Sequence, residues 1–509
     1  MENYIDTLPD TLLSYCFHLS LRGRPEKLRL RHCAALQLVC KRFRRVVTQA
    51  SPEIWHTVIL PMYGIQNLTN ATAFLAHHIP RNTIVAFSCL NRIPFGQAFL
   101  EFLRNHAGSL DYVGLYDVNV PTSVLDFPQF HAVVQGLSQL KTLSLTSGGH
   151  QNLPALALPP LPSLEKVTLD IKGADVTVVP DIIGTQPALN WLVVHAWRKR
   201  RHASLTGRSP CITPWLKTLA SLRTLEITMK FGDAHEIFKN EDGTTYPTLI
   251  ELNLTLYEHP TSYAFLKSFS HVHFAAVRVF SADDIDDSLQ AIVLRNWVHI
   301  RHLSLKQINV GRSAECLSEM PHLNRLQLDG CGVHTLRGLK HNTSLATLWV
   351  YDDNLQDCYG VGGLQKLRGI CLSAPRLTDA SDIQTLRNLV FLGLMQCVRL
   401  RGLPWHISEF TQTLENVRLC AAVCSDIDAQ HLTKVPNLKI VELEGGDLHG
   451  VGKLLESAVK SKATLKTLKW VGLLPREFRI EYPRATALLI KESERRTLSY
   501  KRRKMAAYA

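Results

Sequence analysis

Apolar residues recur along most of the chain in a six-residue frame whose first, fourth and sixth positions are apolar, as in Leu140, Leu143 and Leu145. The fourth and sixth positions are two residues apart, which is the period of a strand with one buried face. Each frame therefore predicts one short strand, and the first position begins the turn that enters it. The sixteen frames begin at Ile84, Leu110, Leu140, Leu164, Leu189, Leu222, Leu249, Phe274, Ile300, Leu323, Leu345, Leu367, Leu389, Leu414, Leu438 and Leu465.

Successive frames are separated by 22 residues (Leu323 to Leu345) to 33 residues (Leu189 to Leu222). Such a period is typical of leucine-rich repeats, in which a single strand cannot bury its apolar face and stacked neighbours supply the core. The sequence thus predicts an α/β leucine-rich-repeat solenoid (a horseshoe) over residues 61–487. The 22-residue repeats leave room for about two helical turns or a 3₁₀ segment on the return path. Residues 451–459 carry such a helical pattern.

The residues that flank the two strand positions are expected to point onto the concave face. Three consecutive repeats place large apolar residues there, and an arginine stands one repeat earlier. The candidate substrate-binding residues are Arg325, Trp349, Tyr351, Phe391 and Met395. Interface hot spots favour Trp, Tyr and Arg. One alternative is that an insertion or the C-terminal tail covers these aromatic residues. If changing Trp349 and Phe391 leaves substrate capture unaltered, the expected site is instead Trp191, His195 and the basic loop Arg198–Arg201.

A different pattern precedes the repeats. Pro9 suits the first turn of a helix whose apolar stripe includes Leu12, Leu13 and Phe17, and a second amphipathic helix begins near Leu36. These helices carry more apolar surface than about sixty residues can bury alone. The surplus faces either the solenoid, as a helical N-terminal cap, or another protein.

Leu8-Pro9-Asp10-x-Leu12-Leu13, Leu38-Val39-Cys40-Lys41-Arg42-Phe43 and the later Ile54-Trp55 resemble an F-box. The resemblance implies a small all-helical domain over residues 1–60 that docks on the Skp adaptor and through it a cullin. It identifies the chain as similar to F-box proteins with leucine-rich repeats, whose repeats hold a protein substrate. Carried over by position, the adaptor-binding residues or F-box core residues are Leu8, Pro9, Leu12, Leu13, Phe17, Leu38, Val39 and Trp55.

Composition limits the other possibilities. The net charge of +13 is concentrated at the ends: residues 22–45 hold nine Lys/Arg and one Glu, and residues 491–504 hold seven Lys/Arg and two Glu, so the two segments sum to +13. A nucleic-acid-binding solenoid would spread its positive charge along the groove, so nucleic acid is not the expected partner. The basic tail, residues 488–509, is either a nuclear-import signal or a solvated terminus. No apolar stretch long enough to span a membrane occurs.

The sequence contains none of the common catalytic motifs. No G-x-S-x-G or H-E-x-x-H occurs, and the twelve cysteines form no C-x-x-C pair. Scattered cysteines fit a reducing compartment, so we expect a cytoplasmic or nuclear protein. We expect no enzyme activity, no cofactor and no metal site.

The leading hypothesis is a substrate-recognition subunit of a Skp-cullin-F-box ubiquitin ligase acting in ubiquitin-dependent degradation. The alternatives are a leucine-rich-repeat scaffold or inhibitor with a helical cap, and a nucleic-acid or chromatin-associated protein that uses its basic ends.

Overall fold

The computed structural model describes part of the chain in detail. The described residues are 57–60, 81–82, 84–89, 97–115, 127–147, 158–172, 178–197, 211–229, 234–239, 245–258, 260, 262–280, 296–400, 412–420, 435–444 and 467–471. Residues 1–56 of the expected N-terminal helical domain, the helix expected at 451–459 and the basic tail at 488–509 lie outside these ranges. The chain divides into two compact units, residues 1–239 with 505–509 and residues 240–504, and each is described by itself.

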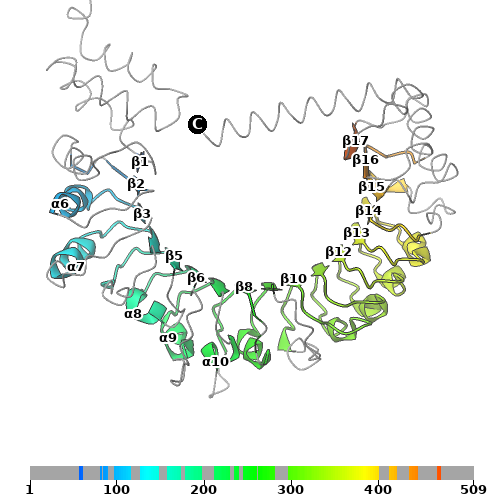
Figure 1. The fold of residues 1–509 in the computed structure, drawn as a ribbon, viewed down its shortest axis with the longest axis horizontal. Helices are drawn as coiled ribbons and strands as arrows, with labels where there is room; N and C mark the ends of the chain where they lie inside the picture. Colours follow the sequence, from blue (N-terminus) through cyan, green and yellow to red (C-terminus); the bar gives the residue numbers. More distant parts are fainter. Residues whose placement is uncertain are drawn as a thin grey trace, which may run out of the picture. The chain divides into compact units, whose positions relative to one another are not determined.

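Unit 1 (residues 1–239 with 505–509) contains a parallel sheet whose strands alternate with short helices. The described elements are β1 (Thr57–Leu60), β2 (Ala86–Cys89), α6 (Gln97–His106), β3 (Tyr112–Leu115), α7 (Phe127–Gln135), β4 (Thr142–Ser147), β5 (Lys166–Lys172), α8 (Val179–Ile183), β6 (Trp191–Trp197), α9 (Thr213–Thr218), β7 (Thr224–Met229) and α10 (Ala234–Ile237). Each strand from β1 to β7 pairs in parallel with the next. The helices lie on the side opposite the strands (Figure 1).

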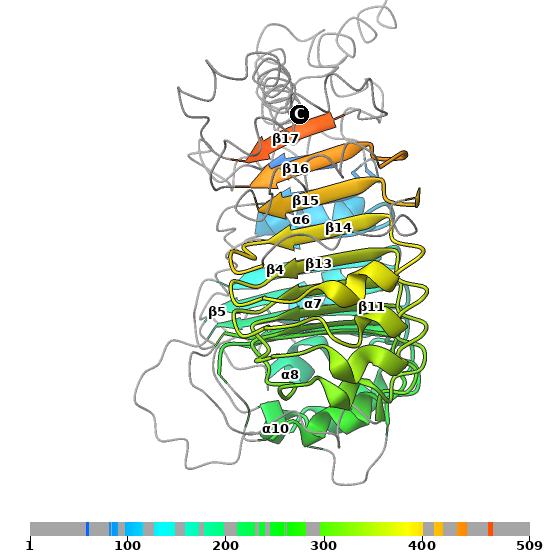
Figure 2. The same ribbon diagram turned by 90° about the vertical axis from the view of Figure 1, so that its right-hand side faces the viewer.

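Unit 2 (residues 240–504) repeats this plan, with 3₁₀ segments on its return paths. Its described elements are β8 (Glu251–Leu256), η5 (Ala264–Phe269), β9 (Phe274–Val279), β10 (His302–Lys306), η7 (Glu315–Leu317), β11 (Arg325–Asp329), η8 (Arg337–His341), β12 (Thr347–Tyr351), η9 (Val361–Gly363), β13 (Gly369–Ser373), η10 (Ser381–Thr385), β14 (Phe391–Met395), β15 (Asn416–Cys420), β16 (Ile440–Glu444) and β17 (Thr467–Val471). All of its paired neighbours run parallel, as the aligned arrows in Figure 2 show. The short return segments expected for the 22-residue repeats are confirmed.

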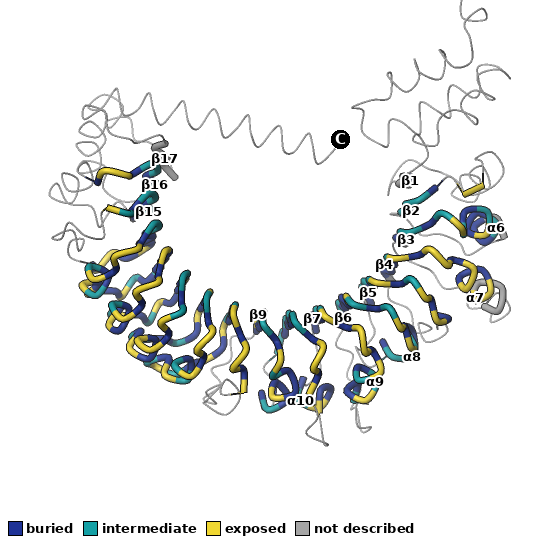
Figure 3. Tube along the Cα trace, turned by 180° about the vertical axis from the view of Figure 1, so that it is seen from behind, coloured by how far each residue is buried: buried dark blue, intermediate teal, exposed yellow. Residues whose placement is uncertain are grey.

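The apolar frame explains why these strands form. In β10, Leu303 and Leu305 are buried, whereas the flanking His302, Ser304 and Lys306 keep part of their surface. The next repeat aligns in register, with Leu303 opposite Leu326 and Leu305 opposite Leu328. Stacking in register therefore builds one continuous leucine core from single strands that have no core of their own. Figure 3 shows buried and partly buried residues along the strands, and exposed residues mainly in the connecting segments.

Two details of the frame differ from the sequence-based prediction. The frame predicted to begin at Phe274 is wrong by two residues: the register places Ala275 opposite Leu252 and Val277 opposite Leu254, so the frame begins at the buried Val272. Phe274 itself is exposed on the outward face. The small Ala275 at a core position hid the true frame. In unit 1, β1 (Thr57–Leu60) adds a strand before the first predicted frame, and its Val58 is fully buried.

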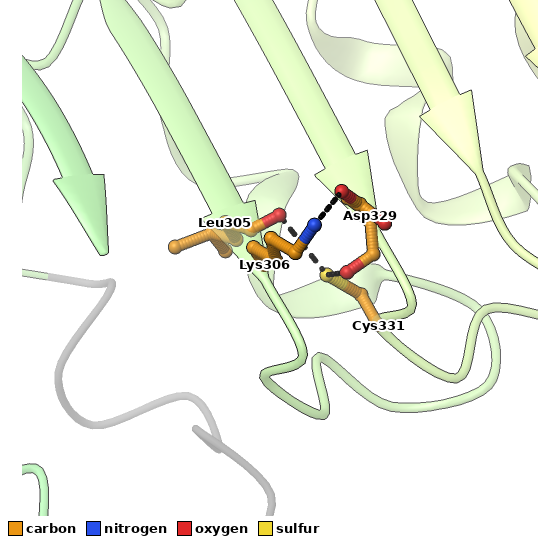
Figure 4. A network of polar contacts seen from close by, with 4 residues as sticks. All are labelled: Leu305, Lys306, Asp329 and Cys331. Atoms are coloured by element: carbon orange, nitrogen blue, oxygen red, sulfur yellow. Dashed lines mark hydrogen bonds and ion pairs between the residues drawn. The ribbon is translucent and has the colours of Figure 1, made fainter. Parts of the chain in front are cut away.

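Two cysteines close the turns that follow strands of unit 2. The Cys331 thiol lies 3.4 Å from the Leu305 carbonyl oxygen of the preceding repeat and 3.6 Å from that of Asp329 (Figure 4). Cys397 repeats the arrangement with the Leu372 and Met395 carbonyls. Burial raises the pKa of the Cys331 thiol to about 12, so it stays protonated and able to donate. Both cysteines are therefore structural links between repeats.

A second set of polar links lies three residues before the frames, where the chain turns toward its strand. Gln186 accepts a bond from the Leu161 amide and donates to the Pro159 and Ile183 carbonyls. The Trp297 indole donates to the Leu266 carbonyl at 3.1 Å, and Asn342 donates to the Leu317 and Met320 carbonyls. Buried carbonyls of the return segments gain partners in this way, and leaving them unpaired would cost stability.

Close approach of neighbouring return segments gives a stability prediction. A Cβ added at Gly338 in η8 would lie 2.5 Å from both the Ser313 carbonyl oxygen and the Glu315 amide nitrogen. Gly338→Ala should therefore lower the free energy of unfolding by about 1–3 kcal/mol, the usual cost of overpacking. Urea unfolding followed by circular dichroism measures the loss.

The matched control is Gly369→Ala, because a Cβ there meets its neighbours only at 3.9 Å or more. Equal unfolding midpoints for the two variants would contradict the close packing of η7 against η8.

Candidate functional site

The candidate site lies on the outward positions of β10 to β14 in unit 2. The second and fourth residues of these five-residue strands are buried in the leucine core, so the first, third and fifth residues point the other way. Parallel register aligns the outward residues into three rows. The first row is His302, Arg325, Thr347, Gly369 and Phe391; the middle row is Ser304, Gln327, Trp349, Cys371 and Gly393; the last row is Lys306, Asp329, Tyr351, Ser373 and Met395.

The structure places the predicted substrate-binding residues on these rows. Trp349 and Tyr351 project from β12, and Phe391 and Met395 project from β14; these four residues are called the aromatic patch below. Arg325 lies on β11, one strand before Trp349 and in the row of Phe391. Trp349 is 41% exposed, whereas Met395 is only 9% exposed. Trp349 is therefore the most accessible apolar member, and Met395 contributes mainly packing.

Small side chains on β13 separate the two halves of the aromatic patch. The outward residues of β13 are Gly369, Cys371 and Ser373, and Gly393 follows in the middle row of β14. Cys371 is buried although its position points outward, and Tyr351 donates a hydroxyl hydrogen bond to its sulfur at 3.9 Å. A Cβ at Gly393 would lie 2.8 Å from that same sulfur. The Cys371 side chain thus packs over Gly393 and joins β12 to β14.

Ion pairs border the aromatic patch on both sides. Lys306 and Asp329 meet at 2.9 Å across β10 and β11 (Figure 4). Arg418 and Glu442 lie 3.6 Å apart across β15 and β16, in the continuation of the middle row. An apolar centre with a charged, hydrated rim is the usual anatomy of a protein interface. The paired charges contribute little energy by themselves, but they exclude other apolar contacts from the rim.

Tyr351 has an altered acidity at the centre of this arrangement. Burial is the main cause, and it raises the pKa of the Tyr351 hydroxyl to about 12, with Cys371 adding to the effect and Arg418 opposing it. The phenol is therefore neutral at physiological pH. It acts as a hydrogen-bond donor to Cys371.

The alternative site belongs to unit 1. Trp191 is 40% exposed on β6, and the Lys166 ammonium of β5 lies 3.3 Å from the centre of its ring. His195 stands on the same strand, opposite Asp170. The basic loop Arg198–Arg201 lies outside the described residues, as do all eight predicted adaptor-binding residues. Lys166 already covers the Trp191 ring, so a ligand would have to displace a cation there.

Within the described ranges, no group of three or more His, Cys, Asp or Glu side chains is arranged to hold a metal ion. Among the helices described in the two units, none is long and apolar enough to cross a bilayer.

Comparisons with known proteins add little to this geometry. No protein-family model matches the sequence, and no curated protein matches it either. The protein nevertheless has a leucine-rich-repeat fold. Its buried frames, parallel register and return segments show this directly.

Several solved structures are similar to the chain. A Listeria monocytogenes internalin shares 13% identity with a TM-score of 0.38 and covers 88% of this chain and 96% of its own. For the mouse RP105/MD-1 complex the identity is 14% and the TM-score 0.48, and the match covers 84% of this chain and 68% of the other. For the Drosophila Toll–Spatzle complex the identity is 12% and the TM-score 0.41, and the match covers 77% of this chain and 57% of the other. At TM-scores below 0.5 these likenesses carry no argument about function.

Cys371 and Gly393 are the residues of this site that the sequence-based prediction missed. Both were expected to point outward, but neither was counted as part of the site because neither resembles an interface hot spot. The signal that was present is the succession of small outward residues on β13 and β14 between bulky neighbours.

The Tyr351 environment predicts a pH effect. The pKa of its hydroxyl is raised in the folded protein above the ordinary value of 10, so the unfolded chain loses this proton first as pH rises. Its contribution to stability is complete below pH 10 and disappears between pH 10 and about 12. Tyr351→Phe should make the unfolding midpoint less sensitive to pH over that range, as measured by urea titrations at pH 9 and pH 11. The control with a more exposed ring is Tyr359→Phe, since Tyr359 is 58% exposed. The same pH sensitivity in Tyr351→Phe and wild type would contradict the assigned environment.

Proposed function

We propose that the strand side of unit 2 binds a protein through the aromatic patch, and that the chain is the substrate-recognition subunit of a Skp-cullin-F-box ubiquitin ligase. The observation that carries the binding role is Trp349, exposed beside Tyr351 and Phe391 on strands held in fixed register. A rigid sheet fixes these side chains before binding, so little conformational entropy is lost on association. The bordering ion pairs limit the apolar surface to one contact area.

The ubiquitin-ligase role is supported by the resemblance of the N-terminal segment to an F-box. In this proposal Leu8, Pro9, Leu12 and Leu13 dock on the Skp adaptor, while unit 2 holds a lysine-bearing substrate. The chain supplies no catalytic group, and it accelerates ubiquitin transfer by raising the local concentration of the substrate near a loaded enzyme. Such a protein works in the cytoplasm or the nucleus. The second candidate is a scaffold or inhibitor that uses the same patch without an adaptor.

Adaptor binding separates the two candidates. Replacing Leu8 and Pro9 by Ala should abolish pull-down of a Skp-type adaptor and leave the circular dichroism of the repeats unchanged, because each repeat is stabilised by its neighbours. Deletion of residues 1–56 is the matched control, since it removes the whole motif but keeps β1 (Thr57–Leu60) in the sheet. Undiminished adaptor recovery with the deletion would reject the ubiquitin-ligase role and favour the scaffold.

The aromatic patch predicts a separable loss of binding. Trp349→Ala combined with Phe391→Ala should weaken capture of bound proteins by about thirtyfold or more, because truncating a central aromatic residue commonly costs more than about 2 kcal/mol. Quantitative mass spectrometry of proteins recovered with the double variant and with wild type measures this loss. Adaptor recovery from the same samples should not change.

Tyr359→Ala serves as the matched aromatic control. Tyr359 is more exposed than Trp349, but it lies in a turn after β12, outside the outward rows, and beside Arg337. If the Tyr359 variant loses the same proteins and the double variant retains them, the aromatic patch is not the binding surface.

A further inference from the structure

The strand-entry end of β9 to β11 in unit 2 gathers histidines and arginines that, apart from Arg325, have no part in the candidate site. These residues, called the histidine edge below, are His271, His273, His299, Arg301, His302 and Arg325. They come from three successive repeats. His271 and His299 immediately precede the first residue of a frame, and His273 and Arg301 immediately follow it. His302 and Arg325 stand at the first outward position of their strands. The register places Phe274, His302 and Arg325 in one row.

Stacking and backbone bonds fix the geometry of the histidine edge. The His271 and His299 rings stack with centroids 5.8 Å apart, and the His273 ring lies 6.4 Å from the His299 ring. His302 meets the ring of Phe274 edge-on at 4.6 Å. The amides of Arg301 and His302 both donate to the His273 carbonyl, and the Arg325 amide donates to the Arg301 carbonyl. The residues of the histidine edge are therefore held side by side by the sheet itself.

Partial burial and neighbouring cationic side chains favour the neutral form of His273 and His302 in the free protein. The pKa of His273 is lowered by partial burial and then by Arg301, His299 and His271. The pKa of His302 is lowered by partial burial and then by Arg325 and Arg301. The neighbouring carboxylates are already engaged: Glu251 on β8 accepts a hydrogen bond from Asn253, and Asp329 pairs with Lys306 at the far end of β11. A bound anion would offset the positive charge of Arg301 and Arg325 and would favour the protonated forms of His273 and His302.

We propose that the histidine edge binds a short acidic segment of a protein and binds it more tightly as pH falls from 7.5 to 5.5. This inference rests on the proposed function in one respect, that unit 2 binds protein on its strand side. Arg325 borders both the histidine edge and the β12 strand that carries Trp349. One partner can therefore contact the aromatic patch with apolar residues and the histidine edge with Asp or Glu residues.

The extent of the histidine edge favours an acidic peptide over a nucleic acid. Three neighbouring strands span about 10 Å at about 4.8 Å per strand, which three or four residues of extended peptide cover. In the first outward row, the strand before β9 carries the acidic Glu251 and the strand after β11 carries the uncharged Thr347. The basic surface therefore extends over only three repeats. Nucleic-acid surfaces continue a basic track over a longer path.

Proton linkage gives the sign of the pH effect. Histidines with a lowered pKa are neutral at pH 7.5, and a bound carboxylate raises that pKa, so binding takes up protons. The affinity for an acidic peptide should therefore rise as pH falls, by at most about tenfold per histidine per pH unit. The free protein has the opposite trend: its unfolded chain binds these protons more readily, so its stability decreases as pH falls below 6.5.

The test uses the full chain and a fluorescein-labelled peptide of six glutamates, with binding followed by fluorescence anisotropy at pH 7.5 and 5.5. Circular dichroism at both pH values confirms that the protein stays folded. Wild type should bind at least about tenfold more tightly at pH 5.5, because two histidines gain protons on binding. His273→Gln combined with His302→Gln should remove that gain. His273→Arg combined with His302→Arg should instead give tight binding at both pH values, which a misfolded variant would not.

The matched control is His341→Gln, because His341 is exposed at the end of η8 and not on the strand side. It should bind as wild type does. Equal affinity of wild type at the two pH values, or loss of binding in His341→Gln, would overturn the inference.

A labelled hexathymidylate of comparable charge tests the other class of partner. Tighter binding of this oligonucleotide than of the peptide would overturn the proposal in favour of nucleic acid. Failure of the glutamate peptide to bind, with Trp349-dependent capture of proteins intact, would reject the histidine edge and leave the proposed function standing.

Discussion

A single repeat of this protein holds one short strand, and the two inward side chains of that strand can be buried only by the repeats before and after it. Leu303 and Leu305 are covered because Leu326 and Leu328 stand beside them in register. Every other feature follows from this constraint. The return segments must be short enough for neighbours to stack, and their buried carbonyls must find partners in the next turn, as Gln186, Trp297 and Asn342 provide.

The same register determines what the outward face can do. Because the inward residues of successive strands align, the outward residues align too, and a side chain is placed beside partners more than twenty residues away in the sequence. Tyr351 contacts Cys371 in this way, and His302 lies beside Arg325. The missing side chain at Gly393 lets Cys371 fill the space between β12 and β14. The aromatic patch and the histidine edge both arise because the register places particular residue types next to one another in the outward rows.

The sequence predicted this repeat plan well because leucine periodicity reports the buried face directly. It predicted the strands and the outward placement of Trp349, Tyr351 and Phe391 for that reason. It failed at β9, where the small Ala275 is buried in the core and the large Phe274 is exposed. The prediction assigned the large apolar residue to the core. It also missed Cys371, which is buried at an outward position and contacts Tyr351 of the neighbouring strand. The N-terminal residues from Leu8 to Trp55 lie outside the described residues, so the F-box resemblance remains a prediction.

The central claim is that protein partners contact the strand side of unit 2 at Trp349. A photo-crosslinking amino acid placed at position 349, and in a separate variant at position 359, tests it most directly in cells. The account predicts discrete protein adducts from position 349 that disappear when Phe391 is also changed to Ala, and few adducts from position 359. The same adducts from both positions, or adducts from position 359 alone, would contradict it.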